Sequence, residues 1–156
     1  MISRSIEPAT PAPGPHSAWR HPRPPRVEPS RRHVVVVFAG EVIAESRHAL
    51  RVLEPDRPPA YYFPLDDCRR TYLVVTPDET FCEWKGVGSR FDVTAGGRVA
   101  HRAAWSYPNP TVRYALLAGC VGVDPGRVDG CWVDGECVEP DDATPRQANL
   151  SRWYAT

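Results

Sequence analysis

Short runs of β-branched and aromatic residues, separated at close spacing by turn residues, make up most of the chain from Val34 onward. This pattern is typical of an antiparallel all-β domain, because tight turns join neighbouring antiparallel strands. We therefore predict one compact, mainly β domain over residues 33–140. We expect its strands at residues 34–38, 41–45, 48–54, 71–75, 80–85, 89–94, 98–107, 120–123 and 131–133.

Two short helical segments interrupt this series of strands. Residues 64–70 predict a helical turn capped by Asp66 or Asp67, and residues 111–117 predict a short helix. Tight turns are expected at Ala39-Gly40 and Asp134-Gly135 and around Gly96-Gly97, where glycine supplies the left-handed backbone.

The first 32 residues have a different composition from the rest. Eight of them are proline, and six arginines outnumber Glu7 and Glu28, which gives this segment a charge of +4. We expect a disordered or polyproline-like leader over residues 1–32, either a plain solvated tail or a ligand for an aromatic-lined groove. Residues 141–156 are expected to form a polar C-terminal tail.

Charge and hydropathy exclude several kinds of partner. The whole chain is neutral, so the predicted domain and tail carry −4 together, unlike dedicated nucleic-acid binders, which concentrate lysine and arginine. The longest apolar runs, 34–39 and 114–123, are far shorter than the roughly 20 residues that a membrane span needs. With no secretory signal at the N-terminus, we expect a cytoplasmic protein.

The cysteines predict free thiols. An odd number without any C-x-x-C fits neither a disulfide framework nor a usual zinc site, so we expect no bound metal. A two-residue turn at Asp134-Gly135 would place Trp132, not Cys131, opposite Cys137. The five cysteines are Cys68, Cys82, Cys120, Cys131 and Cys137.

Lys85 is the most informative single residue. The chain uses arginine for 18 of its 19 Lys and Arg side chains, so a lysine here suggests that a compact ammonium is needed. Its setting between bulky residues and Gly86 favours a pocket, although a surface lysine left by chance is the alternative. Cys82 is a candidate thiol nucleophile nearby, but strand alternation places it on the opposite face from Lys85.

Glu54 lies on the apolar face of the predicted strand 48–54, together with Leu50 and Val52. A carboxylate so placed is disfavoured unless it is paired, and Lys85 would satisfy it. Such a pair occurs both as a structural ion pair and in ligand-binding sites. Tyr62, Trp105 and Tyr107 are candidates for the walls of the same site, with core packing as the alternative.

Several motifs occur in order over the central two thirds of the chain. They include Phe38-Ala39-Gly40-Glu41-Val42, Leu53-Glu54, Tyr62-Phe63-Pro64, Cys82-Glu83-Trp84-Lys85-Gly86 and Trp105-Ser106-Tyr107-Pro108. With them the chain resembles the domain-of-unknown-function 427 family, which is sometimes labelled nucleotidyltransferase-like. The resemblance implies a small β fold of two facing sheets, similar to the tent-like domains of methionine sulfoxide reductase B and cereblon, with a cavity between the sheets.

The same resemblance implies which residues form the site. Glu54, Tyr62, Lys85, Trp105 and Tyr107 match the polar and aromatic positions of the family, whereas Arg90 stands where an aromatic residue is common. The nucleotidyltransferase label lacks independent support, because no second pair of acids, no P-loop and no G-x-G-x-x-G is present. No cofactor is therefore predicted.

Together these features predict a domain that binds a small anionic ligand in a cavity between the sheets. Lys85 would hold the anion and Glu54 would orient Lys85 or accept a ligand hydrogen bond. If a reaction occurs, these two residues are the candidate catalytic acid/base pair. The alternative is a noncatalytic interaction module, in which a sheet edge or the leader meets a protein partner while Lys85 and Glu54 form a structural ion pair.

Overall fold

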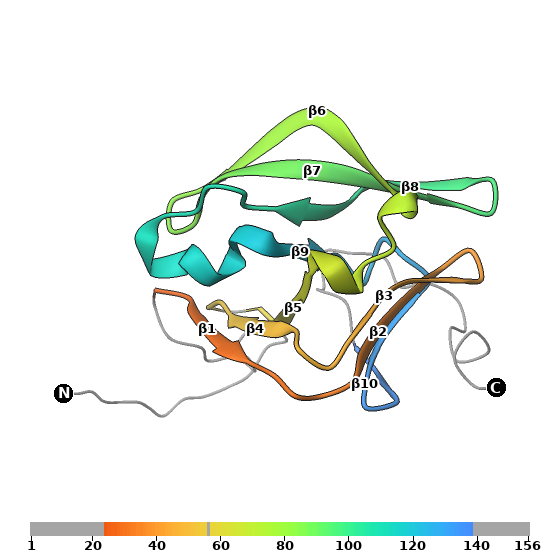
Figure 1. Ribbon diagram of the computed structural model, residues 1–156, viewed down its shortest axis with the longest axis horizontal. Coiled ribbons are helices and arrows are strands. Elements are labelled where there is room, and N and C mark those ends of the chain that lie inside the picture. Colours follow the sequence, from red (N-terminus) through yellow and green to blue (C-terminus); the bar gives the residue numbers. More distant parts are fainter. Residues whose placement is uncertain (1–23, 56, 139–156) are drawn as a thin grey trace, which may run out of the picture.

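The computed structural model describes residues 24–55 and 57–138, and this part of the chain forms two antiparallel sheets (Figure 1). The larger sheet has seven strands, in the order β1 (Arg26–Pro29), β4 (Leu50–Leu53), β5 (Ala60–Pro64), β9 (Cys120–Val123), β8 (Arg98–Ser106), β7 (Gly86–Ala95) and β6 (Leu73–Cys82). The smaller has four, in the order β11 (Glu136–Cys137), β10 (Gly130–Val133), β2 (Val34–Phe38) and β3 (Glu41–Ser46). The predicted mainly β fold of two antiparallel sheets is confirmed.

Several local predictions are confirmed in detail. Residues 34–38 and 120–123 are strands with the predicted bounds, because valine-rich runs favour the extended backbone. The hairpin between β2 and β3 turns at Ala39 and Gly40, whose φ angles are 52° and 78°. Trp132 pairs with Cys137, so the predicted register of the last hairpin is also confirmed.

Other strand predictions are wrong in extent. Residues 71–75 and 80–85 were predicted as separate strands, but β6 runs continuously from Leu73 to Cys82. Its register against β7 shifts between Val75 and Glu79, since proline at an edge strand produces a bulge rather than a turn. Strand β4 ends at Leu53, one residue before Glu54.

Two strands were not predicted at all. Strand β5 lies within the large sheet, but Pro58 and Pro59 before it and Pro64 at its end resemble turn signals. Strand β1 lies inside the predicted leader and pairs with β4 at the sheet edge, where the missing N–H of Pro29 is tolerated. The folded region therefore starts before His33. Residues 1–23 of the leader and the predicted tail lie outside the described residues.

The predicted helical segments are short 3-10 helices. η2 (Leu65–Asp67) and η3 (Arg70–Tyr72) precede β6, and η4 (Val112–Gly119) precedes β9. The predicted cap by Asp66 or Asp67 is wrong, since Pro64 begins η2 without a side-chain cap. Asp67 instead accepts a hydrogen bond from the Ser46 hydroxyl at 2.6 Å.

Alternation along the strands gives the large sheet two faces with separate cores. One face packs against the four-stranded sheet through an apolar core that includes Val36, Ile43, Phe63 and Val121. The opposite face packs against η4, which Figure 1 shows as the cyan coil in the curve of the large sheet. This second core comprises Val52, Tyr62, Tyr107, Tyr114, Leu117 and Cys120.

Candidate functional site

Lys85 lies in the turn that joins β6 to β7, between Cys82 and Gly86, which form the last pair of the two strands. The turn directs the lysine inward, and the residue is only 3% exposed. Its carbonyl accepts the N–H of Thr111 at 3.2 Å, and Gly86 follows with a φ of 102° that glycine adopts without strain. The only lysine of the chain is therefore not a surface residue.

The Lys85 ammonium forms an ion pair with the carboxylate of Glu54, which follows β4. It also lies 3.7 Å from Cys82 Sγ and 5.4 Å from the centroid of the Tyr107 ring. Cys82 and Lys85 thus share one environment, contrary to the prediction from strand alternation, because Lys85 belongs to the turn rather than to the strand. The Glu54 side chain is 26% exposed, so the pair reaches from the interior to the surface.

The ion pair determines the protonation of Lys85. Burial lowers the pKa of the ammonium, but the charge of Glu54 and the hydrogen bond to it outweigh burial, and the pKa is raised above 10.5. Lys85 is therefore charged at neutral pH. It is suited to act as a fixed cation and hydrogen-bond donor, because a raised pKa means that the proton is held tightly, whereas a nucleophile or base needs the free amine.

Tyr62 on β5 and Trp105 on β8 meet across β9. Both pair with Gly122, and a side chain there would place its Cβ 2.8 Å from the indole. Trp105 Nε1 donates to Tyr62 Oη at 2.8 Å, and the two rings meet edge to face with centroids 6.1 Å apart. Burial raises the pKa of Tyr62 well above its usual range, so the phenol stays protonated at neutral pH.

Arg90 on β7 continues this row of side chains. It pairs with Trp105, and its guanidinium carbon lies 6.0 Å from the centroid of the Trp105 ring, a cation–π arrangement. Arg90 is half-buried and, within residues 24–55 and 57–138, its guanidinium has no carboxylate partner. The sequence identified Arg90 only as a departure from an aromatic position of the family and not as a site residue, because its neighbours depend on strand register. Gly122 carried a usable signal, since glycine inside a valine strand indicates close approach.

The structure thus brings together all five residues predicted for the site and adds Arg90. We call this set the polar–aromatic cluster: Glu54, Tyr62, Lys85, Arg90, Trp105 and Tyr107. Tyr62, Trp105 and Tyr107 belong to the second core, on the sheet face that packs against η4. The expected position between the two sheets is therefore corrected, because apolar side chains of the main core pack there.

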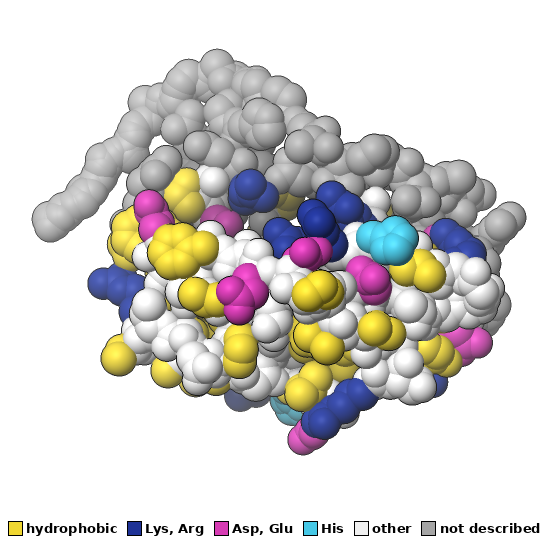
Figure 2. Space-filling view, turned by 90° about the horizontal axis from the view of Figure 1, so that it is seen from above, with side chains coloured by type: hydrophobic (Ala, Val, Ile, Leu, Met, Phe, Trp, Pro, Cys, Tyr) yellow, Lys and Arg dark blue, Asp and Glu magenta, His cyan; other side chains and the backbone are white. Residues whose placement is uncertain are grey.

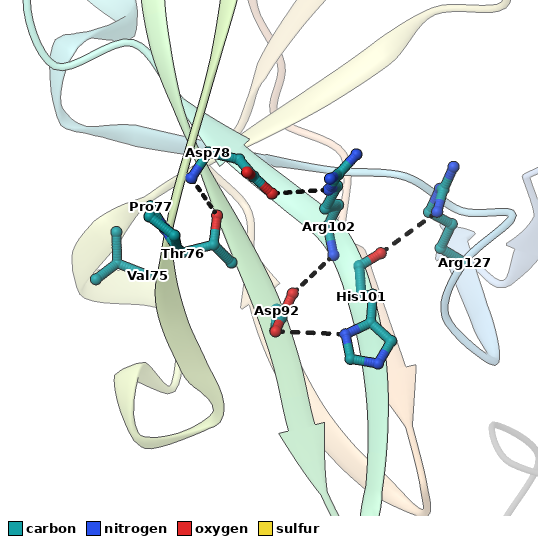
Figure 3. A pocket seen from close by; sticks show the side chains of 8 residues that line it. All are labelled: Val75, Thr76, Pro77, Asp78, Asp92, His101, Arg102 and Arg127. Carbon is teal, nitrogen blue, oxygen red and sulfur yellow. Dashed lines mark hydrogen bonds and ion pairs between the residues drawn. The ribbon is translucent and has the colours of Figure 1, made fainter.

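Two surface pockets lie apart from the polar–aromatic cluster. One has a volume of about 550 Å³ and is lined by residues of β6, β7, β8 and the β9–β10 turn (Figure 3). The other, of about 420 Å³, is lined by His33, Glu45, Ser46, Arg47, His48 and Asp67. In the part of the chain that the structure describes, no three His, Cys, Asp or Glu residues are placed to hold a metal, and no helix is long and apolar enough to cross a membrane.

Comparison with known families agrees with these motifs. The family model described as a domain of unknown function (DUF427) matches residues 26–134. The matched range begins with β1, ends just after β10 and contains every residue of the polar–aromatic cluster. No curated protein sequence matches the chain. Because the match covers well over half of the 156 residues, the chain belongs to the DUF427 family.

Proposed function

We propose that the protein binds a small anionic molecule at the polar–aromatic cluster. The observation that supports this proposal is the charge of the cluster, which contains two cations, Lys85 and Arg90, but one carboxylate, Glu54. Lys85 and Glu54 neutralise each other, so the charge of Arg90 remains. A half-buried guanidinium has lost part of its hydration, and an anionic ligand would restore hydrogen bonds to it.

Each residue of the cluster then has a separate role. Arg90 contacts the anionic group, with Trp105 as the platform that holds the guanidinium. Lys85 fixes Glu54 through the oxygen Oε2, and the other carboxylate oxygen, which has no described partner, accepts a hydrogen bond from the ligand. Tyr62, Trp105 and Tyr107 form the walls.

The same arrangement limits the chemistry of any reaction at the site. Lys85, held charged by Glu54, would act as a fixed cation that stabilises negative charge on the ligand. Burial raises the pKa of Tyr107 although the charge of Lys85 opposes this, so its phenol would act as a hydrogen-bond donor rather than as a base. Glu54 is the base candidate, because part of its side chain is exposed.

The proposal is tested by ligand-dependent thermal stabilisation. Wild type, Arg90→Gln and Lys85→Met would be heated with nucleotides, sugar phosphates and small carboxylic acids, with Arg113→Gln as the control. Arg113 is exposed on η4 and changes charge by the same amount. A ligand at one hundred times its Kd should stabilise wild type by ~2.7 kcal/mol. We expect Arg90→Gln to weaken the apparent affinity about tenfold or more, the effect of losing roughly 1.4 kcal/mol.

Two results would contradict the proposal. If no compound raises the Tm of wild type, ligand binding at the cluster loses its support. If Arg90→Gln is stabilised as strongly as wild type and Arg113→Gln, the charge argument is wrong. Lys85→Met should also bind anions more weakly, because Glu54 would then lie near the ligand without its counter-charge.

A noncatalytic interaction module is a second candidate, favoured by exposed apolar side chains at the sheet edge. Phe81 on the edge strand β6 is 73% exposed and pairs with Val87, which is 50% exposed. Figure 2 looks down on the side of the molecule where β6 and β7 lie and shows hydrophobic side chains across it. In this reading Lys85 and Glu54 are a structural pair. Loss of a copurifying protein from Phe81→Asp but not from Lys85→Met would favour it.

We also infer a cytoplasmic location. All five cysteines are free thiols, the state expected in a reducing compartment. Fractionation of cells that express the full chain would test this inference, and recovery of the protein outside the cytoplasm would contradict it.

A further inference from the structure

The 550 Å³ pocket lies where two register shifts in the large sheet and a turn meet (Figure 3). Strand β6 shifts register against β7 between Val75 and Glu79. The register of β7 against β8 shifts between Phe91 and Val93. A turn at residues 124–127 contributes Arg127. Bulges redirect side chains and are frequent next to functional sites, so their convergence here favours a ligand-binding pocket.

Arg102 is the conformational outlier of this pocket. Its φ is 55°, and it lies inside β8. Only two other non-glycine residues in the described part of the chain have a positive φ. Ala39 and Asp134 share the conformation, but both precede glycine in hairpin turns that require it. A left-handed residue costs of order 1–3 kcal/mol and persists where its surroundings hold it. Asp92 holds Arg102 by accepting its backbone N–H at 2.9 Å.

The carboxylates of the pocket are used to fix this geometry. Asp92 Oδ2 lies 3.5 Å from His101 Nδ1, and its Oδ1 accepts the N–H of Arg102. Asp78 Oδ2 accepts a hydrogen bond from Arg102 Nε at 2.9 Å. Figure 3 shows the Asp78 carboxylate directed toward Arg102 and the Asp92 carboxylate directed toward Arg102 and His101. These acids orient Arg102 through its backbone N–H and its Nε, and neither acid accepts a hydrogen bond from the two Nη groups.

Arg127 is held in a similar way. Its Nε lies 3.3 Å from Asp124 Oδ2, and its Nη1 donates to the carbonyl of His101 at 3.4 Å. Asp124 also accepts the N–H of Gly126 at 2.9 Å, so the turn itself is fixed. Both guanidiniums are therefore anchored through Nε. Within the described chain, the two Nη groups of Arg102 and Nη2 of Arg127 have no acceptor.

We propose that this pocket binds an oxyanion, the phosphate, sulfate or carboxylate group of a small molecule, between Arg102 and Arg127. A guanidinium edge presents two N–H groups whose spacing matches two oxygens of such a group, so the two form charge-assisted hydrogen bonds. More than half of each arginine side chain is exposed, at 59% and 54%, so the free edges are accessible from solvent. The site is separate from the polar–aromatic cluster and does not depend on the function proposed for it.

The experiment is an NMR titration of the ¹⁵N-labelled full chain with inorganic phosphate, against sodium chloride at equal ionic strength. Glycerol phosphate and acetate form separate arms that distinguish free phosphate, a phosphate ester and a carboxylate. We expect saturable shifts of the pocket amides. Arg102→Gly removes the guanidinium and suits the left-handed backbone, so it should fold yet bind at least tenfold more weakly. Arg127→Gln should also weaken the response of the pocket amides, whereas Arg113→Gln should leave it as in wild type. In Lys85→Met, which alters only the other site, the shifts of the pocket amides should still saturate as in wild type.

Three results would overturn the proposal. Shifts that chloride reproduces, or that do not saturate with any of the three compounds, would show that there is no specific site. An unchanged titration of Arg102→Gly together with lower stability would make Arg102 a structural ion-pair residue only. Loss of the pocket-amide shifts in Lys85→Met would place the anion at the polar–aromatic cluster instead.

Discussion

Replacement of Glu54 by glutamine would leave the Lys85 ammonium without its counter-charge in a nearly dry environment, because the lysine side chain is 4% exposed. Removing one partner of a buried ion pair costs ~3–5 kcal/mol. Glu54 is 26% exposed, so water lies near the pair and the lower end of that range, ~3 kcal/mol, applies. In a domain of this size roughly 4 °C of Tm corresponds to each kcal/mol, so the Tm should fall by about 12 °C.

Matched variants separate the charge from the packing. Lys85→Met removes the buried charge and keeps an unbranched apolar side chain, so it should cost less than Glu54→Gln. The double variant should recover most of the stability that Glu54→Gln loses, since neither charge remains. Asp66→Asn is the control, because its ion pair with Arg70 is exposed and should contribute nothing measurable. Urea denaturation of wild type and of the four variants gives the free energies.

The pH dependence has opposite signs in wild type and in Glu54→Gln. In wild type the pKa of Lys85 is raised above 10.5, so its contribution is complete below 10.5 and is lost as pH rises through the folded pKa. In Glu54→Gln burial acts alone and lowers that pKa, so the variant gains stability as pH rises through it. The unfolding free energies of wild type and Glu54→Gln should therefore become more similar as the pH becomes alkaline. Two results would refute the buried-pair reasoning. One is a loss of unfolding free energy below ~1 kcal/mol in Glu54→Gln, and the other is a difference between the two proteins that stays constant from neutral pH to about pH 10.

Three further predictions concern other parts of the fold. Gly122→Ala would place Cβ 2.8 Å from the Trp105 indole, so urea denaturation should show a loss of ~1–3 kcal/mol; an unchanged midpoint would contradict the close approach. Tyr114→Phe removes the 2.8 Å hydrogen bond to the carbonyl just before β1, which should speed hydrogen exchange in β1, and equal protection would argue against this anchor. Cys131 is buried and burial raises the pKa of its thiol to about 12, whereas Cys137 is exposed. Mass spectrometry after brief alkylation at neutral pH should find Cys137 modified first, and similar rates for both would be inconsistent with this burial.

Local features of the chain were predictable where a short segment determines its own conformation. Residues 34–38 and 120–123 are valine-rich, and Ala39-Gly40 and Asp134-Gly135 supply the left-handed backbone of tight hairpins. The hairpin turn also determines which residues face each other, so Trp132 could be placed opposite Cys137 from the sequence alone. None of these predictions needs distant residues.

The errors occur where distant pairing overrides local signals. Pro77 resembles a turn residue, but β6 continues through it because an edge strand tolerates a bulge. Strand β5 follows Pro58 and Pro59, ends at Pro64, and exists because β4 and β9 pair with it on either side. Strand β1 likewise exists because it pairs with β4. The proline-rich segment that contains β1 has no feature of its own that indicates this pairing.

The sequence by itself determined a mainly β domain and, through a solitary lysine and the alternation around Glu54, a pair of interacting charges. Only the tertiary structure decided that this pair lies on the sheet face against η4, that Arg90 stacks on Trp105, and that Arg102 turns into a pocket. The reason is physical. Alternation along one strand determines which side chains share a face, but which strands lie side by side, and in what register, depends on pairing between segments far apart in the chain.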